Sequence, residues 1–449
     1  MRRRGNAPYN RRLKRCSALM NYKFRVCLMS HSSGEKLSAY GYGPAKLLAA
    51  AKEKLLEPDV RISFFDLKEN FGDTQQDVEI VRNENPDILG LSVFLWNFDR
   101  VENILCNIRE TLPDTIIVLG GPNAPGYELL SKQPWLPDFI VTGEGEEAFV
   151  SIVKKLVDGS LRSLDSISTK TDMRKKGLFK PQILSGCAQS LESSPSPYLT
   201  NVYVPPGELV YMETSRGCPN QCSFCVSGNE RAKIRFFSLD IIRREIAWAF
   251  ENCKKNINFC DAALNYNNKR LKEIAQAALD VDPSGKLSFT FALHADHLSA
   301  AQIEILSRLN IACATMGLNS TNPATFDTVK RSIDPEKFKE KVSLLKKLPN
   351  SNITIMMGLP GDTVDGFKRT LEYCASLDVQ INCYELRVFP GTLFFDNASR
   401  FDLKYDLSDG LKALSCFSYS NDDLNSMREL FEQYAASSKR FVRGDQTPL

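Results

Sequence analysis

Residues 208–225 read ELVYMETSRGCPNQCSFC, and this stretch decides how the second half of the chain folds. The part before the cysteines is strand-like, so Cys218, Cys222 and Cys225 occupy a loop directly after a first strand. Three thiolates on one short loop can ligate three corners of a four-iron, four-sulfur cluster and leave one iron open. No histidine stands at zinc-finger distance from them, so the pattern favours a [4Fe-4S] cluster over a zinc site.

The same spacing, with the aromatic Phe224 before the last cysteine, resembles the signature of the radical S-adenosylmethionine (SAM) superfamily. The resemblance covers about residues 208–395. In that family the open iron binds the methionine part of SAM, and an electron from the cluster cleaves the sulfonium to give a 5′-deoxyadenosyl radical. The resemblance therefore implies that the three cysteines hold the cluster and that Phe224 borders the adenine.

The chain after the cysteines repeats strand and helix signals. Strand-like stretches such as KLSFTFALHADHL (286–298) and ITIMMGLPGDT (353–363) each precede a stretch with helical periodicity. Six strand–helix steps predict a partial (β/α)6 barrel over 205–395, typical of the superfamily. In barrels of this sort the chemistry lies at the carboxyl ends of the strands.

Several strand ends match family positions for SAM. Asp261 stands where the family often has a Gly-Gly-Glu stretch, but the glycines are missing, so only the location carries over. Asn319 and Ser320 stand where ribose or carboxylate contacts are usual, and Gly358 lies in a strand that resembles the one beside the adenine. The alternative for each polar residue is a helix cap or a turn.

Four further residues are candidates for catalysis. His294 and Asp296 end the third barrel strand, and Glu385 and Arg387 share one face of the last strand because strand side chains repeat every two residues. The first pair, with His297, could bind a metal, although no third ligand is identifiable; satisfied polar groups or substrate contacts are the alternative. Radical chemistry favours substrate or cofactor binding by Glu385 and Arg387 over acid–base work.

The first half of the chain also alternates strand and helix signals, from KFRVCLMS onward. This alternation predicts an α/β fold with a doubly wound, flavodoxin-like parallel sheet and a binding crevice at the carboxyl ends of its strands. Those ends are polar or glycine-rich. A glycine pair at a strand end allows the backbone to approach a bulky ligand; tight turns are the alternative reading.

The order of these strand ends, followed by DFIVTGEGEEAF, resembles cobalamin-binding domains fused to radical SAM enzymes, over about residues 22–160. The family's Asp-x-His-x-x-Gly motif is incomplete: His31 and Gly34 are present, but position 29 is Met, so His31 is an ambiguous cobalt ligand. The alternative is that the lower face of the cofactor lies against the loop 94–97. The aromatic side chains of this loop could equally pack against other parts of the protein. The residues that the resemblance places at cobalamin are Ser92, Phe94, Trp96, Asn97, Gly120, Gly121, Gly143 and Glu144.

Composition is that of a globular protein: 449 residues, 43% hydrophobic and 25% charged. Its 13 cysteines are scattered, and no apolar run suits a membrane helix or a secretory signal, so we expect reduced thiols, a cytoplasmic location and no membrane partner. A basic tail could bind nucleic acid, but a disordered extension is the favoured reading. The expected divisions are a disordered tail (1–21), a cobalamin-binding domain (22–160), a linker (161–204), the barrel (205–395) and a helical C-terminal segment (396–449).

The two resemblances together imply a cobalamin-dependent radical SAM enzyme with three cofactors: a [4Fe-4S] cluster, SAM and cobalamin. The leading hypothesis is methylation of an unactivated carbon or phosphorus in a small molecule or peptide, with electrons from an external flavodoxin- or ferredoxin-type reductant. The second is a radical cyclisation, ring contraction or rearrangement in which cobalamin is not a methyl donor. The third is a non-catalytic iron–sulfur or nucleic-acid-binding module. The sequence does not name the substrate.

Overall fold

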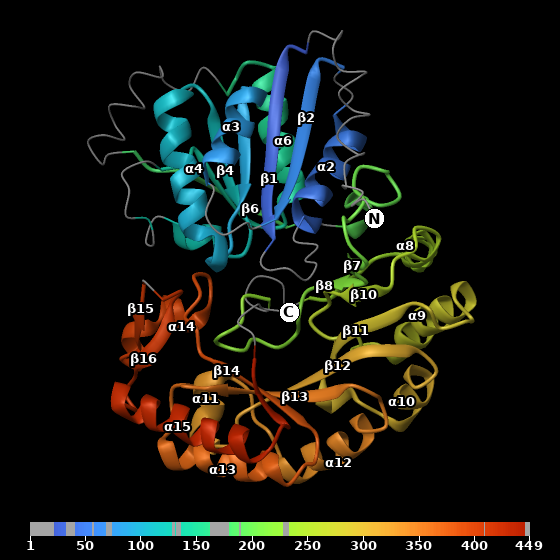
Figure 1. The fold of residues 1–449 in the computed structure, drawn as a ribbon, viewed down its shortest axis with the longest axis vertical. Helices are drawn as coiled ribbons and strands as arrows, with labels where there is room; N and C mark the ends of the chain where they lie inside the picture. The colour runs from blue at the N-terminus through green and yellow to red at the C-terminus, as the bar shows by residue number, and fades with distance from the viewer. Residues whose placement is uncertain are drawn as a thin grey trace, which may run out of the picture.

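The computed structural model describes residues 22–32, 41–55, 58–68, 74–127, 131, 136–161, 179–187, 190–227, 233–407 and 409–444. The predicted basic tail lies outside the described residues, as does Gly34 of the incomplete histidine motif. Figure 1 shows two parallel sheets, the first above the second, with β7 and β8 at the junction. Among the described residues, no helix has both the length and the apolar character needed to cross a bilayer.

The first sheet has the strand order β2-β1-β3-β4-β5-β6, with every pair parallel. This is the predicted flavodoxin-like arrangement, in which the order reverses between β1 and β3 and opens a crevice. The strands are β1 (Phe24–Ser32), β2 (Val60–Lys68), β3 (Ile88–Ser92), β4 (Ile116–Gly120), β5 (Phe139–Gly143) and β6 (Gln182–Gly186).

Helices cover both faces of this sheet. On one face Val26 and Leu28 of β1 pack in a core with residues of α2 and α6, and on the other Cys27 and Met29 pack with residues of α3 and α4. The alternation follows from the two-residue repeat of a strand, and burial on both faces explains the continuous apolar character of β1. The helices are α2 (Tyr42–Lys54), α3 (Thr74–Glu84), α4 (Phe98–Thr111) and α6 (Gly145–Val157).

The predicted linker 161–204 contributes a strand to the first sheet. Strand β6 lies inside it and pairs in parallel with β5, from Phe139 opposite Gln182 to Gly143 opposite Gly186. An edge strand of five residues, several of them exposed, carries little apolar pattern, so periodicity does not reveal it.

The second sheet has the order β7-β10-β11-β12-β13-β14-β17 and is open, because its two end strands do not pair. Its first six strands are those expected from the sequence. The seventh, β17 (Phe441–Arg443), comes from the segment expected to be helical and pairs with β14 through Ile381 and Phe441. The other strands are β7 (Leu209–Met212), β10 (Asn256–Phe259), β11 (Ser288–Leu293), β12 (Asn310–Asn319), β13 (Ser351–Met357) and β14 (Gln380–Glu385).

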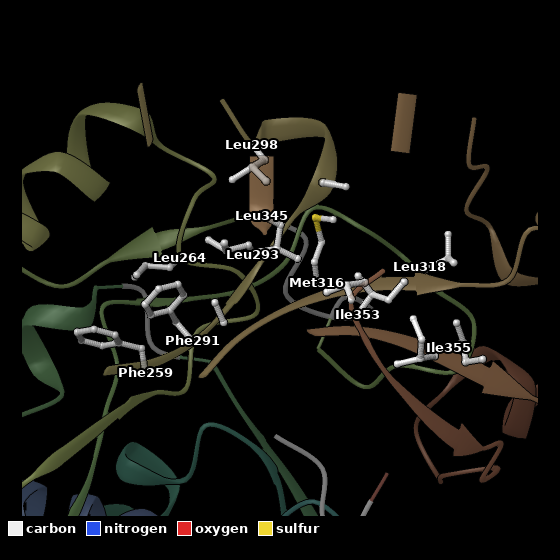
Figure 2. Close-up of a cluster of buried hydrophobic side chains, with 14 of the residues drawn as sticks. Phe259, Leu264, Phe291, Leu293, Leu298, Met316, Leu318, Leu345, Ile353 and Ile355 are labelled. Atoms are coloured by element: carbon white, nitrogen blue, oxygen red, sulfur yellow. The ribbon is translucent and has the colours of Figure 1, made fainter. Parts of the chain in front are cut away.

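The core of the barrel lies between these strands and the helices outside them. Figure 2 shows Phe291 of β11, Met316 of β12 and Ile353 of β13 among the side chains of this buried cluster, together with Leu345 of α12. Side-chain caps start many of the helices; Thr363, for example, accepts a hydrogen bond from the amide of Gly366 before α13. The helices are α8 (Leu239–Glu251), α9 (Asn268–Val281), α10 (Ala300–Leu306), α12 (Pro335–Leu345), α13 (Val364–Ala375) and α15 (Asn421–Ser437).

Candidate active site

A cavity of about 280 Å³ lies where the strand ends of the first sheet meet the segment after β7. Glycines make up much of its wall. A Cβ atom added at Gly43 or Gly120 would meet no other atom within 4 Å, so packing within the chain does not require glycine at either position. The space that the missing side chains leave belongs to the cavity and suits a bulky ligand approached by backbone. The lining glycines are Gly43, Gly90, Gly120, Gly121, Gly143 and Gly145.

Most of the residues predicted to bind cobalamin line this cavity. They are Ser92, Phe94, Gly120, Gly121, Gly143 and Glu144.

Trp96 and Asn97 are not among the lining residues. Asn97 is buried and shapes the loop, since its side chain donates to the carbonyl of Ser92 at 2.8 Å and accepts from the amide of Phe94 at 2.8 Å. The Trp96 ring stacks on Phe94 with centroids 4.3 Å apart. Their direct contact with a cofactor stays a prediction.

His31 lies on the other face of the first sheet. In β1 it falls on the side of Cys27 and Met29, whereas Leu28 lines the cavity. Its Nε2 is 3.0 Å from Oδ2 of Asp77 in α3, and the His31 side chain is 1% exposed. Burial opposes ionisation of Asp77, but hydrogen bonds with His31 and Arg100 outweigh it and lower the pKa of this carboxyl. In the structure, His31 therefore contacts the carboxylate of Asp77 and does not line the cavity.

Three charged side chains that sequence reasoning missed, Lys46, Glu213 and Arg216, also line the cavity, together with Glu146 of the glycine-rich strand end. Lys46 is buried in α2 and donates to the carbonyl of Ser194 at 3.2 Å. Burial opposes ionisation of Glu146, but Arg216 lowers the pKa of this carboxyl to about 2. No local pattern distinguishes these residues from surface charges, and only their burial between the two domains marks them.

The cysteine loop is held in place on both sides. Two short antiparallel strands, β8 (Ser215–Arg216) and β9 (Arg235–Phe236), frame it. Inside the loop, the amide of Ser223 donates to the carbonyl of Val329 at 3.1 Å, and the carbonyl of Ser223 accepts from the amide of Phe394 at 2.9 Å. Phe224 packs against the barrel core. The loop is therefore anchored to distant parts of the barrel through its main chain.

The three thiols fit a cluster better than a single metal ion. Cys218 and Cys222 are buried and Cys225 is partly buried, and none of the cysteines that the structure describes is in a disulfide. The described residues contain no group of three His, Cys, Asp or Glu side chains placed around one ion. In a four-iron cluster each thiolate binds a different iron, so the sulfur atoms need not converge on one point.

Tyr266 lies beside the first cysteine. Its hydroxyl is 3.3 Å from Sγ of Cys218 and accepts from the side chain of Asn220 at 3.1 Å. Its ring also contacts that of His294, with centroids 5.7 Å apart. Sequence reasoning missed Tyr266, because it lies in the loop between β10 and α9 without a motif of its own.

His294, at the end of β11, is buried, and neither ring nitrogen has a hydrogen-bond partner among the described residues. Its Nδ1 is 3.8 Å from Oδ2 of the exposed Asp296, too far for a hydrogen bond. Burial, with the charge of Arg331, lowers the pKa of His294 to about 4. The ring is therefore neutral at pH 7 and carries one N–H donor and one bare acceptor nitrogen.

The residues predicted to bind SAM differ in whether their polar atoms already have hydrogen-bond partners within the chain. The Asp261 carboxylate accepts from the amide of Thr214 at 2.9 Å and from the hydroxyls of Thr214 and Ser215, which ties β10 to the start of the cysteine loop. Asn319 adopts a left-handed conformation with φ of 68°, and its buried Nδ2 has no partner among the described residues. Ser320 accepts from the amide of Asn322 at 3.0 Å, which is a turn contact.

Gly358, Glu385 and Arg387 all contact the C-terminal segment. The carbonyl of Gly358 accepts from the hydroxyl of Tyr419 at 2.6 Å. Glu385 pairs with Arg428 of α15 at 3.0 Å and with Arg443 of β17 at 3.2 Å. Arg387 donates to the carbonyls of Asp409 and Gly410, and a Cβ at Gly410 would lie 3.6 Å from Leu95 of the first domain.

Comparison with known protein families agrees with the division of the chain into two α/β domains. Residues 44–153 match the B12 binding domain, and residues 212–374 match the Radical SAM superfamily. The chain joins a B12-binding domain to a radical SAM domain. A radical SAM domain uses a [4Fe-4S] cluster and SAM, and a B12-binding domain uses cobalamin. The glycine-lined cavity, the three thiols and the unpartnered polar atoms of His294 and Asn319 fit these three groups.

Two curated relatives and one solved structure show what this radical SAM chain is similar to. The 2-(S-pantetheinyl)-carbapenam-3-carboxylate methyltransferase of Streptantibioticus cattleyicolor is 26% identical over 68% of this chain and 47% of the relative. The anaerobic magnesium-protoporphyrin IX monomethyl ester cyclase of Synechocystis is 24% identical over 54% of this chain and 49% of the relative. The chain thus spans about half the length of these two relatives.

The solved structure is the radical SAM methyltransferase TsrM of Kitasatospora setae with cobalamin and a [4Fe-4S] cluster bound. It superimposes with a TM-score of 0.68 over 95% of this chain and 92% of that chain, at 14% sequence identity. This likeness concerns the fold.

Proposed function

We propose that the protein methylates an unactivated carbon or phosphorus atom of a small molecule or peptide, by cobalamin-dependent radical SAM chemistry. One observation carries the proposal. The cavity of the B12-binding domain is also lined by Glu213 and Arg216, and Arg216 is two residues from Cys218. The residues that hold a corrinoid and those that hold a cluster therefore border one another, as a reaction that uses both requires.

When bound, the cluster supplies the electron that cleaves SAM to the 5′-deoxyadenosyl radical, and cobalamin supplies the methyl group. Cys218, Cys222 and Cys225 hold the cluster, and the burial of Cys218 and Cys222 keeps water away from the site. In this proposal SAM lies against Phe224 and the strand ends at Asp261, Asn319, Ser320 and Gly358.

His294 is the residue we propose to orient the reacting molecule. Its neutral ring presents one N–H and one bare nitrogen, and neither is used by the described residues. A ligand that hydrogen-bonds to both nitrogens would be held in one orientation beside Tyr266 and Cys218. Asp296 is exposed at the rim, where it can contact a polar part of the substrate.

Glu385 and Arg387 act in this proposal by holding the C-terminal segment against the barrel. Their contacts with Arg428, Arg443 and the carbonyl of Asp409 support a positioning role. That segment also approaches the loop after β3 at Leu95, so it borders both domains. We expect it to contribute to the selection of substrate.

A one-electron reductant of the flavodoxin or ferredoxin type and a cytoplasmic location belong to the proposal. Radical SAM enzymes use an external reductant, and thiols that ligate a cluster need a reducing compartment. No nucleic-acid partner is proposed.

A radical cyclisation or rearrangement is the second candidate. The similarity to the magnesium-protoporphyrin IX monomethyl ester cyclase favours this second candidate. About half of the length of that cyclase matches this chain, a share similar to that of the methyltransferase relative. Product mass separates the two candidates. Methylation adds one methyl group and releases S-adenosylhomocysteine, whereas cyclisation or rearrangement adds no methyl group.

The test is anaerobic reconstitution with iron, sulfide and hydroxocobalamin, then dithionite and SAM, with mass spectrometry of the products. We expect bound corrinoid and 5′-deoxyadenosine, and with candidate acceptors a mass gain of one methyl group. Cys218→Ala should abolish 5′-deoxyadenosine formation, and Cys253→Ala is the matched control, because Cys253 is exposed and outside the loop. A loaded cluster that yields no 5′-deoxyadenosine would refute the proposal. So would a protein that forms it but binds no corrinoid.

A further inference from the structure

Two arginines frame the cysteine loop, and both bind the same glutamate of the B12-binding domain. Arg216 in β8 lies directly opposite Arg235 in β9. Arg235 donates to both carboxylate oxygens of Glu144, and Nη1 of Arg216 is 3.5 Å from Oε2 of Glu144. Nη2 of Arg216 donates to Oε1 of Glu146 at 2.7 Å and also to Oε2 of Glu213, in its own domain, at 2.7 Å. We call Glu144, Glu146, Arg216 and Arg235 the interdomain clamp.

The interdomain clamp is shielded from water. The side chains of Glu144, Glu146 and Arg216 are 3%, 7% and 9% exposed, and that of Arg235 is 16% exposed. Charge pairs in such a setting are weakly screened by salt, and Glu144 and Arg216 each have more than one partner in this network. The contact therefore constrains how the two domains meet far more than a surface ion pair would.

Both ends of the clamp adjoin a cofactor site. Glu144 directly follows Gly143 at the end of β5, and Glu144, Glu146 and Arg216 all line the glycine-rich cavity. Arg216 is separated from Cys218 by a single glycine, Gly217, with φ of 105°. Nη1 of Arg216 makes no hydrogen bond to the described residues and contacts Glu144 only as an ion pair at 3.5 Å.

We propose that the interdomain clamp couples corrinoid binding to the cysteine loop, so that each cofactor binds more tightly when the other is present. A corrinoid in the cavity touches the side chains that hold β8 and β9, and a cluster holds the loop between those strands. Both ligands thus favour the same position of Arg216 and Arg235. Coupling of this kind is reciprocal, which makes it measurable from either cofactor. The proposal rests on the proposed use of both cofactors.

The experiment is an anaerobic absorbance titration with hydroxocobalamin, on protein with and without the reconstituted cluster. In the unaltered protein we expect about tenfold tighter binding when the cluster is present. Arg235→Gln should bring the two affinities within about twofold of each other, while iron content and circular dichroism stay unchanged. Arg235→Lys keeps the positive charge but cannot donate to both carboxylate oxygens of Glu144 at once. This variant should therefore retain only part of the difference in hydroxocobalamin affinity between protein with and without the cluster.

Arg61→Gln is the matched control. Arg61 pairs with Glu84 inside the B12-binding domain, at 3.2 Å and away from the cavity, so this variant should keep the full tenfold difference. Equal affinities in the unaltered protein, or an undiminished difference in Arg235→Gln, would overturn the coupling while leaving the proposed function intact. A protein with a loaded cluster that binds no hydroxocobalamin would overturn the proposed function itself.

Discussion

Two buried histidines end parallel strands of this molecule, and they differ in what their rings contact. His31, near the end of β1, has its Nε2 3.0 Å from Asp77, which is held in turn by Arg100. His294, after β11, has no partner for either nitrogen among the described residues, whereas His31 lacks one only at Nδ1. A buried polar group without a partner costs about 1–3 kcal/mol, so a site that tolerates this cost is one that a ligand completes. The comparison teaches that the contacts of a histidine, more than its place at a strand end, separate function from packing.

Replacement of His294 should have the largest effect on turnover. His294→Ala removes both ring nitrogens, and we expect 5′-deoxyadenosine and product formation to fall about 100-fold, a typical loss for a positioned polar group. The melting temperature should change little, because no hydrogen bond to the described residues is lost. His31→Ala, which removes the other buried histidine, is the control. Unchanged turnover in His294→Ala would remove the distinction between the two histidines.

Replacement of His31 should affect stability and leave the corrinoid unchanged. His31→Ala removes the partner of the buried Asp77, and we expect a loss of about 2 kcal/mol in the free energy of unfolding. The electron paramagnetic resonance spectrum of bound cob(II)alamin should be the same in both proteins. A nitrogen splitting present in the unaltered protein and lost in His31→Ala would show that the ring reaches cobalt after all.

The acid dependence of stability should report on the buried ring of His294. The pKa of His294 is about 4 in the folded protein because burial and the charge of Arg331 disfavour protonation, whereas an unperturbed histidine has a pKa of about 6.5. The unfolded chain therefore binds this proton first, and stability falls as the pH decreases from about 6.5 towards 4. Urea unfolding at pH 7 and pH 5 should show about 2 kcal/mol less pH dependence in His294→Phe than in the unaltered protein. An identical pH dependence would contradict the buried, neutral ring.

Tyr266→Phe should give the smallest effect. It removes the hydroxyl beside Cys218 but keeps the ring against His294, so the cluster should assemble normally. Loss of one hydrogen bond is worth about 1 kcal/mol, and we expect turnover to fall about fivefold together with a more negative reduction potential. Spectroelectrochemical titration of the cluster measures the potential. An unchanged potential would mean that the hydroxyl does not act on the cluster.

Much of the architecture was predictable from local pattern. The strands β1 to β5 and the six strands β7 and β10 to β14 follow from apolar runs separated by helical periodicity, and Cys218, Cys222 and Cys225 follow from their spacing. Strands β6 and β17 were not predictable, because both are short and lie at sheet edges, where few side chains are buried. Their pairing depends on a neighbour that local sequence does not contain.

The candidate site likewise has a part that was predictable from local sequence and a part that was not. The glycine-rich strand ends and the cysteine loop carry their chemistry in consecutive residues, so the sequence by itself determined the fold class, the two domains and the cofactors. The partners of His31 and His294, and the meeting of Glu144 with Arg216 and Arg235, were decided only by the tertiary structure. The physical reason is that burial, charge pairing and a shifted pKa depend on distances between residues far apart in the chain, and no local pattern records those distances.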